Sequence, residues 1–322
     1  MMESHENAPV LRTRIYVDGY NFYYGCLKGT PYKWLDMMVL FEQHVLPSIL
    51  VQVDGKPAQS KLNPLAIKYF TAMILEKAAK AADSVSCQAR YHSALRKVHP
   101  ERIQIVEGYY SLLEAKAKIV DAENPDKWPR ECQEILIWKL EEKKSDVSLA
   151  LQAYHDAMTG EVDQVVIVTN DTDISPALKM IRDHTKVVVG LVVPTRKDVR
   201  IPNTELADVS HWVRSHITDV ELEKSQFPRV IPGRKATVKP ESWFPVPREI
   251  LERVLALAAP IRGGKGKAFN WLETPNPYLG GEIPLKLIET EEGAERVIAY
   301  MQTYIAEMAE KSASGKDAEK SP

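Results

Sequence analysis

The chain has 322 residues, which is enough for about two domains of ordinary size. Hydrophobic residues make up 44% of it and charged residues 27%, which excludes collagen-like, wholly disordered and disulfide-scaffold proteins. With 42 Lys and Arg against 44 Asp and Glu, the formal net charge is −2, so the chain does not coat nucleic acid as a polycation would. Any contact with nucleic acid must come from local patches.

The first 215 residues are predicted to alternate between strands and helices. The two clearest strands, 165–169 and 187–193, are almost entirely apolar, which is typical of a parallel sheet buried on both faces. We therefore predict an α/β domain of doubly wound type with an inserted β-hairpin. In chain order, the predicted elements are strand 15–17, helix 34–50, strand 67–75, helix 83–98, strand 103–110, hairpin strands 116–120 and 134–140, helix 145–158, strand 165–169, helix 175–183 and strand 187–193.

The pattern changes near residue 223. Residues 224–239 contain Pro, Gly and basic residues but no acid, a composition that predicts a linker. Four helices are predicted beyond it, and together they form a small all-α domain. The predicted division is an α/β domain at 12–222, a linker at 223–243, a helical domain at 244–310 and a disordered tail at 311–322. The helices predicted in the helical domain are 248–259, 268–273, 284–288 and 291–309.

Cysteine content and hydropathy point to the cytoplasm. Cys26, Cys87 and Cys132 are too few and too scattered for a disulfide framework or a zinc knuckle. The N-terminus carries acids and no apolar segment, and no stretch approaches 18 uninterrupted apolar residues. We therefore expect a cytoplasmic protein that makes no contact with a membrane.

Carboxylates stand where the predicted strands end. Asp18 closes the first strand, Asp171 and Asp173 follow the strand that begins at Val165, and Asp146 opens the helix after the hairpin. In a doubly wound sheet, ligands bind in the crevice outside the carboxyl ends of the strands. Each acid alone is well explained as a helix N-cap or turn residue. Four together repel one another and raise their pKa values unless a cation neutralises them.

The donor set suggests the chemistry. Oxygen ligands with no His or Cys nearby suit a hard divalent ion, Mg²⁺ or Mn²⁺. Such an ion activates water and stabilises charge on a phosphoryl oxygen, so the residues predict a metal-dependent nuclease. Asp18, Asp171 and Asp173 are expected to hold the ion directly or through water. Asp146 is expected to hold a second ion or to orient the attacking water, and Asn21 to contact a phosphate or tie down the first loop.

Basic residues of the predicted helix 83–98 are candidates for contact with substrate. Arg90, Arg96 and Lys97 give this helix a basic face that could guide a phosphate backbone beside the carboxylates. The alternative is an ordinary solvated surface. RNA is the expected nucleic-acid partner.

Three separated segments resemble the NYN family of PIN-like nucleases. They are Y-V-D-G-Y-N at 16–21, E-E-K-K-S-D-V-S-L-A at 141–150 and V-I-V-T-N-D-T-D-I-S-P-A at 166–177. The resemblance spans 12–215 and implies a PIN-like Rossmannoid fold, a Mg²⁺ or Mn²⁺ centre and ribonuclease activity. It also makes Lys144, in the basic stretch before the second acid, a candidate phosphate ligand, although a solvated lysine is the alternative. The metal and catalytic roles fall on Asp18, Asn21, Asp146, Asp171 and Asp173.

The C-terminal helices resemble a different family. Residues 270–285, N-W-L-E-T-P-N-P-Y-L-G-G-E-I-P-L, are similar to the C-terminal toxin-binding domain of Xre/MbcA/ParS-type antitoxins. The resemblance implies a protein-binding or dimerising module at 244–310 and carries over no catalytic residue. Much of the motif is also explained by the fold alone, since Trp271 anchors a helix and Pro284 begins the next one.

The leading interpretation is a metal-dependent endoribonuclease with a helical partner-binding domain. One alternative is a PIN-like module that binds RNA or protein without cleaving it. A second is another phosphoryl-transfer enzyme on the same sheet, such as a phosphatase. A third is a toxin–antitoxin or defence system in which the nuclease is the effector and residues 244–310 regulate or recruit it.

Overall fold

The computed structural model describes the backbone of residues 8–318 and the side chains of residues 8–310. The chain divides into two compact units between Lys239 and Pro240. The first unit carries a mixed, mostly parallel sheet, and the second is helical, which confirms the predicted fold class. None of the helices within residues 8–318 is long and apolar enough to cross a membrane.

The first unit is built on a sheet in which β1 is central. The strand order is β5-β4-β3-β1-β6-β7-β8, and β2 pairs with β3 outside this path. All neighbours along the path are parallel except β4 and β5. The strands are β1 (Val10–Asp18), β2 (Val51–Val53), β3 (Lys56–Met73), β4 (Ile103–Lys118), β5 (Glu134–Lys143), β6 (Gln164–Val168), β7 (Val188–Val192) and β8 (Trp212–Arg214).

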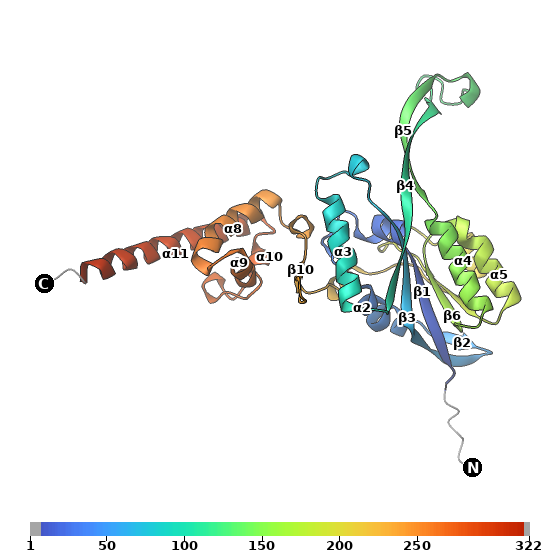
Figure 1. Ribbon diagram of the computed structural model, residues 1–322, viewed down its shortest axis with the longest axis horizontal. Helices are drawn as coiled ribbons and strands as arrows, with labels where there is room; N and C mark the ends of the chain where they lie inside the picture. Colours follow the sequence, from blue (N-terminus) through green and yellow to red (C-terminus); the bar gives the residue numbers. More distant parts are fainter. Residues whose placement is uncertain (1–7, 319–322) are drawn as a thin grey trace, which may run out of the picture. The chain divides into compact units, whose positions relative to one another are not determined.

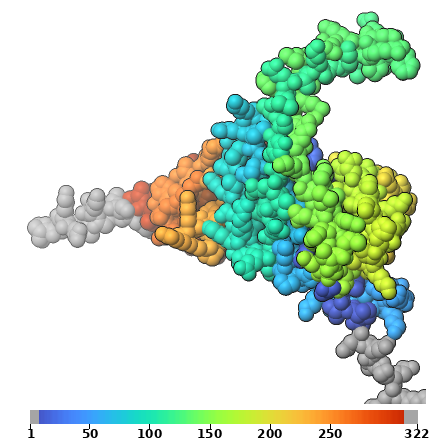
Figure 2. Space-filling model, turned by 45° about the vertical axis from the view of Figure 1, so that its right-hand side comes forward, coloured from blue at the N-terminus to red at the C-terminus, as the bar shows by residue number. Residues whose placement is uncertain are grey.

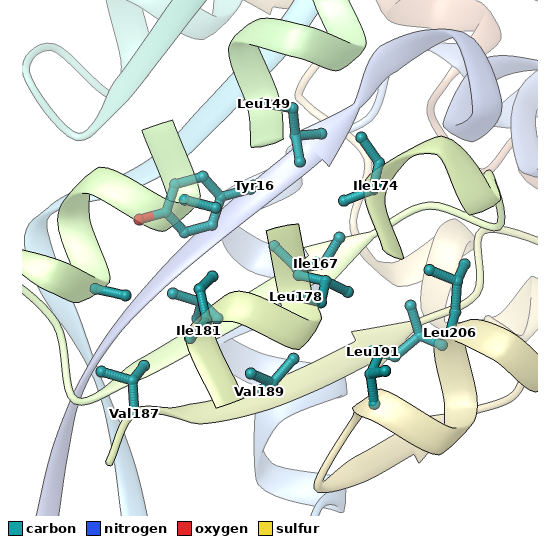
Figure 3. Close-up of a cluster of buried hydrophobic side chains, with 14 of the residues drawn as sticks. Tyr16, Leu149, Ile167, Ile174, Leu178, Ile181, Val187, Val189, Leu191 and Leu206 are labelled. Carbon is teal, nitrogen blue, oxygen red and sulfur yellow. The ribbon is translucent and has the colours of Figure 1, made fainter. Parts of the chain in front are cut away.

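Helices cover both faces of this sheet (Figure 1). On one face, α4 (Ser145–Met158), α5 (Ser175–His184) and α6 (Thr204–Val209) enclose an apolar core. Figure 3 shows Tyr16 of β1 and Ile167 of β6 gathered with side chains of α4 and α5 in this core. On the other face lie α2 (Met37–Val39) and α3 (Ser84–Val98). The uninterrupted apolar runs of β6 and β7 are thus buried on both sides, as parallel strands require.

Several predicted elements differ in detail. The strands predicted at 15–17 and 67–75 begin earlier, as β1 at Val10 and β3 at Lys56. The helix predicted at 34–50 is three consecutive short pieces: α2, a π-helical segment (Leu40–Val45) and a 3-10 turn (Leu46–Ser48). The predicted strands 103–110 and 116–120 are one continuous strand, β4, because no turn-forming residue interrupts them. β4 and β5 pair from Tyr109 opposite Lys143 to Lys118 opposite Glu134, and this β4–β5 arm (residues 109–143) projects from the body of the unit (Figures 1 and 2).

The segment predicted as a linker packs on the first unit up to Lys239. The indole nitrogen of Trp34 donates to the carbonyl of Pro228 at 2.9 Å, and Phe227 is buried. The residues β9 (Val230–Ile231) and β10 (Thr237–Val238) form a two-stranded sheet that contacts α3. Apolar residues within this basic stretch therefore anchor it, which its overall composition does not reveal. Short helices α1 (Gly19–Phe22) and α7 (Asp219–Lys224) complete the unit.

The second unit has its own apolar core. Helices α8 (Arg248–Arg262), α9 (Lys265–Leu272), α10 (Pro284–Leu287) and α11 (Glu291–Ala318) surround buried residues such as Val254, Leu272 and Val297. The helix α11 continues into the segment 311–322, where a disordered tail was expected, and residues 319–322 of that segment lie outside the described residues.

A buried charge cluster joins α4 to the sheet. Asp156 of α4 accepts hydrogen bonds from Arg14 at 2.6 Å, from Lys68 at 2.8 Å and from the hydroxyl of Tyr16 at 2.6 Å. All four side chains are nearly inaccessible to solvent. Burial by itself would raise the pKa of Asp156, but these hydrogen bonds outweigh burial and lower it. Asp156 and Glu161, which also pairs with Arg14 at 2.8 Å, therefore together balance the charges of Arg14 and Lys68.

Replacing Asp156 tests this role. Asp156→Ala is expected to lower the free energy of unfolding by about 3–5 kcal/mol, because Lys68 would remain buried without its charged partner and Arg14 would keep only Glu161, which is 51% exposed, as a charged partner. Urea denaturation followed by circular dichroism measures the loss. The matched control is Asp163→Ala, which removes an ion pair between Asp163 and Arg12 whose side chains are 37% and 53% exposed. Its expected cost is about 0–1 kcal/mol, and equal losses in the two variants would contradict the assignment.

Candidate functional site

The candidate site lies between β1 and β6, where the chain switches from adding strands on one side of the sheet to adding them on the other. From β1 the chain continues to β3 on one side of the sheet, and from β6 it continues to β7 on the other. β1 and β6 are parallel neighbours, so the loops after them diverge and leave a crevice between them. Asp18 ends β1, and Asp171 follows β6. The topology thus brings together two acids that are far apart in the sequence.

Asp18 is held firmly in this crevice. One carboxylate oxygen accepts the backbone N–H of Asn21 at 3.0 Å, and the other accepts the Asn21 amide and the Thr169 hydroxyl, both at 2.7 Å. Gly19 follows because a Cβ there would come within 2.6 Å of the carbonyl oxygen of Phe70. Burial raises the pKa of Asp18, which is 3% exposed, and its hydrogen bonds offset this only in part.

Thr169 connects the loops after the two central strands. Its hydroxyl donates to Asp18, and its hydroxyl oxygen accepts the backbone N–H of Asp171 at 3.1 Å. Asp171 in turn caps the short helical turn Thr172–Ile174 by accepting the N–H of Asp173 at 3.1 Å. Asp18 and Asp171 therefore do cap the turns that follow them, but both also line one cavity.

Two more acids come from the junction between β5 and α4. Asp146 is in the first turn of α4, and Glu142 lies near the end of β5. Glu142 accepts hydrogen bonds from the hydroxyls of Ser145 and Tyr110. The pKa of Glu142 is raised by burial first and by the charge of Asp18 second.

Asp146 is electrostatically the most strained member of the group. Its pKa is raised to about 6, mainly because the cavity walls displace water from the carboxylate. Repulsion by Asp18, Asp171, Glu142 and Asp173 adds to the rise, in that order. These four neighbours show that Asp146 belongs to the same acidic group as the loops after β1 and β6.

The cavity shared by these acids has a volume of about 580 Å³. The acids that line it are Asp18, Asp146, Asp171, Glu141 and Glu142. Tyrosines and lysines also line it, namely Tyr20, Tyr23, Tyr24, Tyr110, Lys80 and Lys143. The tyrosines contact one another, with ring centroids 4.5 Å apart for Tyr20 and Tyr24 and 5.3 Å apart for Tyr23 and Tyr24.

The donor set fits a hard divalent cation by its chemistry. These acidic side chains all present oxygen atoms, and the pKa values of Asp18 and Asp146 are raised first by burial and then by repulsion among the acids. In the described part of the chain, however, no three acidic, His or Cys side chains converge closely enough to hold an ion as they stand. Binding would therefore require rotation of these side chains.

The structure separates the predicted site residues into two groups. Asp18, Asn21, Asp146 and Asp171 line the cavity. Asp173 is exposed and does not line it, although its charge reaches Asp146. The basic residues predicted to contact substrate do not line the cavity either. The Lys144 ammonium lies over the ring of Tyr109, 5.2 Å from its centroid. Arg90, Arg96 and Lys97 lie on α3, where Arg96 pairs with Glu107 at 3.0 Å and Lys97 donates to Thr237 at 2.6 Å.

Glu142, Tyr110 and Lys80 were not predicted as site residues. Glu142 lies four residues before Asp146, at the end of a hairpin strand, and this position could have marked it as a further acid of the site. Tyr110 lies in the middle of β4 and reaches the site only because β4 pairs with β5. Lys80 lies in a loop with no motif around it, so the sequence offered no signal for it.

Two family models match the chain. The model of the NYN domain matches residues 12–209, and the model of the antitoxin Xre/MbcA/ParS C-terminal toxin-binding domain matches residues 257–302. Both resemblances seen in the sequence are thereby confirmed. The C-terminal match marks a toxin-binding type of domain, which indicates a protein partner.

A characterised relative and a solved structure are also similar. The 6-hydroxy-3-succinoylpyridine 3-monooxygenase HspA of Pseudomonas putida (strain DSM 28022 / S16) is 58% identical over 311 residues, covering 96% of this chain and 99% of the relative. The crystal structure of a protein of unknown function, VPA0982 from Vibrio parahaemolyticus RIMD 2210633, covers 65% of this chain and 94% of its own, with 17% identity and a TM-score of 0.35.

The strained electrostatics of Asp146 should appear as a pH-dependent stability effect. Because its pKa is about 6 in the folded state and about 4 in an unfolded chain, the unfolded state ionises first as pH rises. Folding stability therefore falls between about pH 4 and pH 6 and stays lower above that range. Asp146→Asn is expected to stabilise the protein above pH 6, in the absence of divalent ions, and to have little effect below about pH 4.

Urea unfolding at a series of pH values measures this difference. Asp183→Asn is the matched control, since it removes the same charge from the exposed end of α5, away from the cavity. A stability gain for Asp146→Asn that is equal at all pH values would contradict the raised pKa.

Proposed function

We propose that this chain, which belongs to the NYN-domain family, is a metal-dependent endoribonuclease that hydrolyses phosphodiester bonds of RNA. The observation that supports this most directly is the meeting of Asp18, Asp146, Asp171 and Glu142 at the crevice between β1 and β6. Like charges gathered in a cavity destabilise a protein, so a purely structural role does not explain them.

The acids would hold Mg²⁺ or Mn²⁺. Asp18, Asp171 and Asp146 are the proposed ligands, and Asp173 is a further candidate that would act through water. A bound ion of this kind lowers the pKa of water and stabilises charge on a phosphoryl oxygen. Asn21 and Thr169 keep the carboxylate of Asp18 in place through their hydrogen bonds, so one donor is oriented before the ion arrives.

Asp146 and Glu142 are the proposed proton acceptors. With a pKa of about 6, the Asp146 carboxylate is mostly ionised near neutral pH, yet basic enough to accept a proton from an attacking water. Glu142 is held by Ser145 and Tyr110 beside it. The two residues line the cavity from the β5–α4 junction.

The tyrosines and lysines that line the cavity suit a nucleotide. Tyr20 and Tyr23 are 48% and 37% exposed, so their rings are available to stack on an unpaired base. Lys80 and Lys143 supply positive charge for a phosphate. Lys144 and the α3 residues Arg90, Arg96 and Lys97 would contact RNA only outside this cavity.

The second unit is proposed to bind a protein partner. Its match to a toxin-binding domain supports a role in recruiting or regulating the nuclease, as in a toxin–antitoxin or defence system. A cytoplasmic location is part of the proposal, and it agrees with the free thiols of Cys26, Cys87 and Cys132.

Neutralising one acid should abolish cleavage. Asp171→Asn is expected to lower the rate of RNA cleavage by at least about a hundredfold, because it removes a ligand charge facing Asp18 and Asp146. Cleavage of single-stranded RNA, duplex RNA and DNA is measured with Mg²⁺, with Mn²⁺ and with EDTA, which should stop the reaction.

The control is again Asp183→Asn, which should cleave at the wild-type rate. If Asp171→Asn cleaves as fast as wild type, the proposed site is wrong. If wild type binds RNA but cleaves no substrate under any condition, the chain is a binding module of the same family. Release of phosphate from a phosphomonoester without cleavage of RNA would favour a phosphatase.

A second candidate function comes from the relative named a monooxygenase. The identity of 58% over 96% of the chain makes hydroxylation of a pyridine compound a specific alternative. The tyrosine-lined side of the cavity could accept a single aromatic ring. This reaction needs a reductant and a group that activates dioxygen, whereas phosphodiester hydrolysis needs neither.

The two functions are separable by one assay. Wild type and Asp171→Asn are incubated with 6-hydroxy-3-succinoylpyridine and NADH, with and without added flavin or Fe²⁺, while dioxygen consumption and products are followed. Under the nuclease proposal, neither protein should hydroxylate the pyridine compound above the rate without protein. Hydroxylation that requires wild-type Asp171 would assign the cavity to the monooxygenase reaction instead.

A further inference from the structure

The strand β5 is an open edge of the sheet. It follows β4 at one end of the strand order, and within the described residues no strand pairs with its outer side. It is ten residues long and lies in the β4–β5 arm, which stands clear of the body of the unit (Figures 1 and 2). The outer side of β5 therefore presents a row of unpaired backbone donors and acceptors.

The same strand exposes large apolar side chains on one face. Leu136 is 65% exposed, Trp138 is 66% exposed and Leu140 is 46% exposed. The three alternate along the strand, so their side chains point to the same side of the arm. A two-stranded arm is marginally stable in water by itself, and a long apolar edge is prone to pair with another strand.

We propose that β5 pairs with β5 of a second copy of this chain, antiparallel, about a two-fold axis next to Trp138. Residues opposite each other in such a pair lie on the same face of the sheet. With the axis at Trp138, Trp138 lies opposite its own copy, and Leu136 lies opposite Leu140 of the second copy. The segment Leu-x-Trp-x-Leu reads the same in both directions, so it is complementary to itself.

Neighbouring registers are less favourable. An axis at Lys139 would place two lysines opposite each other, and like charges in that position are destabilising. An axis at Ile137 would place Leu140 opposite Glu134. Among these registers, only the one centred on Trp138 places all three exposed apolar residues of this face opposite one another.

The charges of the arm are compatible with this register. Glu134 would lie opposite Glu142 of the second copy, but Lys116 and Lys118 already pair with Glu134 at 3.0 and 3.4 Å. On the other face, Lys139 forms an ion pair with Glu141 within its own strand. Glu134 and Lys139 therefore keep charged partners within their own chain, whereas Glu142, at the end of the paired segment, would face Glu134 of the second copy.

The dimer would also reach the candidate site. Leu140 lines the cavity together with Glu142 and Lys143, which follow it on β5. Leu136 of the second copy, opposite Leu140, would then stand beside the cavity mouth. A second copy would narrow the access to the acids, so association and substrate entry would be linked.

Sedimentation velocity of the full chain over a range of concentrations tests the association. Wild type is expected to be a dimer, and Trp138→Lys is expected to raise the dissociation constant by at least about a hundredfold, since two central aromatic side chains are lost. Trp128→Lys is a matched control because Trp128 is 65% exposed on the same arm but lies outside β5. It should leave the dimer unchanged.

Cross-linking tests the register. In a Cys132→Ser background, Leu136→Cys combined with Leu140→Cys keeps Trp138 and should give disulfide-linked dimers, because opposite Cα atoms lie about 4.5–5.5 Å apart in antiparallel pairs. Leu136→Cys alone should not cross-link, since the two thiols would be offset by four residues, about 13 Å.

Three results would overturn the proposal. The first is a monomeric wild type at every concentration, and the second is a dimer that survives Trp138→Lys or is weakened equally by Trp128→Lys. The third is cross-linking of the single cysteine variant as readily as the double one. None of these results depends on whether the chain cleaves RNA.

Discussion

Repulsion among carboxylates at the crevice between β1 and β6 is the constraint around which the first unit is arranged. Asp18 is almost fully buried there, and the pKa of Asp146 is raised to about 6, first by partial burial and then by repulsion from the neighbouring acids. Asn21 and Thr169 hold Asp18 by hydrogen bonds that compensate only part of the cost. The fold tolerates this arrangement because the central strands are buried on both faces and fix the loops that carry the acids.

Asp156 shows that a buried acid of this domain can be neutralised by buried cations. Asp156 is as inaccessible as Asp18, yet Arg14 and Lys68 pair with it directly. No such cation pairs with Asp18 in the described residues, and Lys143, although it lines the cavity, pairs with Glu141. The contrast between two buried acids of one domain supports a role for the crevice in binding a cation or a reacting group.

The sequence predicted the elements that depend on local pattern and missed those that depend on distant partners. Helix 145–158 was predicted with its observed bounds, because its apolar spacing and its boundary at Ser145 are both local signals. The acids after β1 and β6 could be placed together because the ends of parallel strands meet at one edge. Tyr110 could not be placed at the site, since its position follows from the pairing of β4 with β5. The packing of residues 226–238 was equally hidden, because it rests on contacts with Trp34, almost 200 residues away.

That packing sets the true end of the first unit. Phe227 covers Trp34 with ring centroids 5.9 Å apart, and Lys97 holds Thr237, so the chain closes over α3 well after the last strand of the main sheet. A fragment cut where the family match ends, at residue 209, would expose this aromatic surface. The α/β unit should therefore be isolated, or its helical second unit exchanged for that of a relative, with the junction between Lys239 and Pro240.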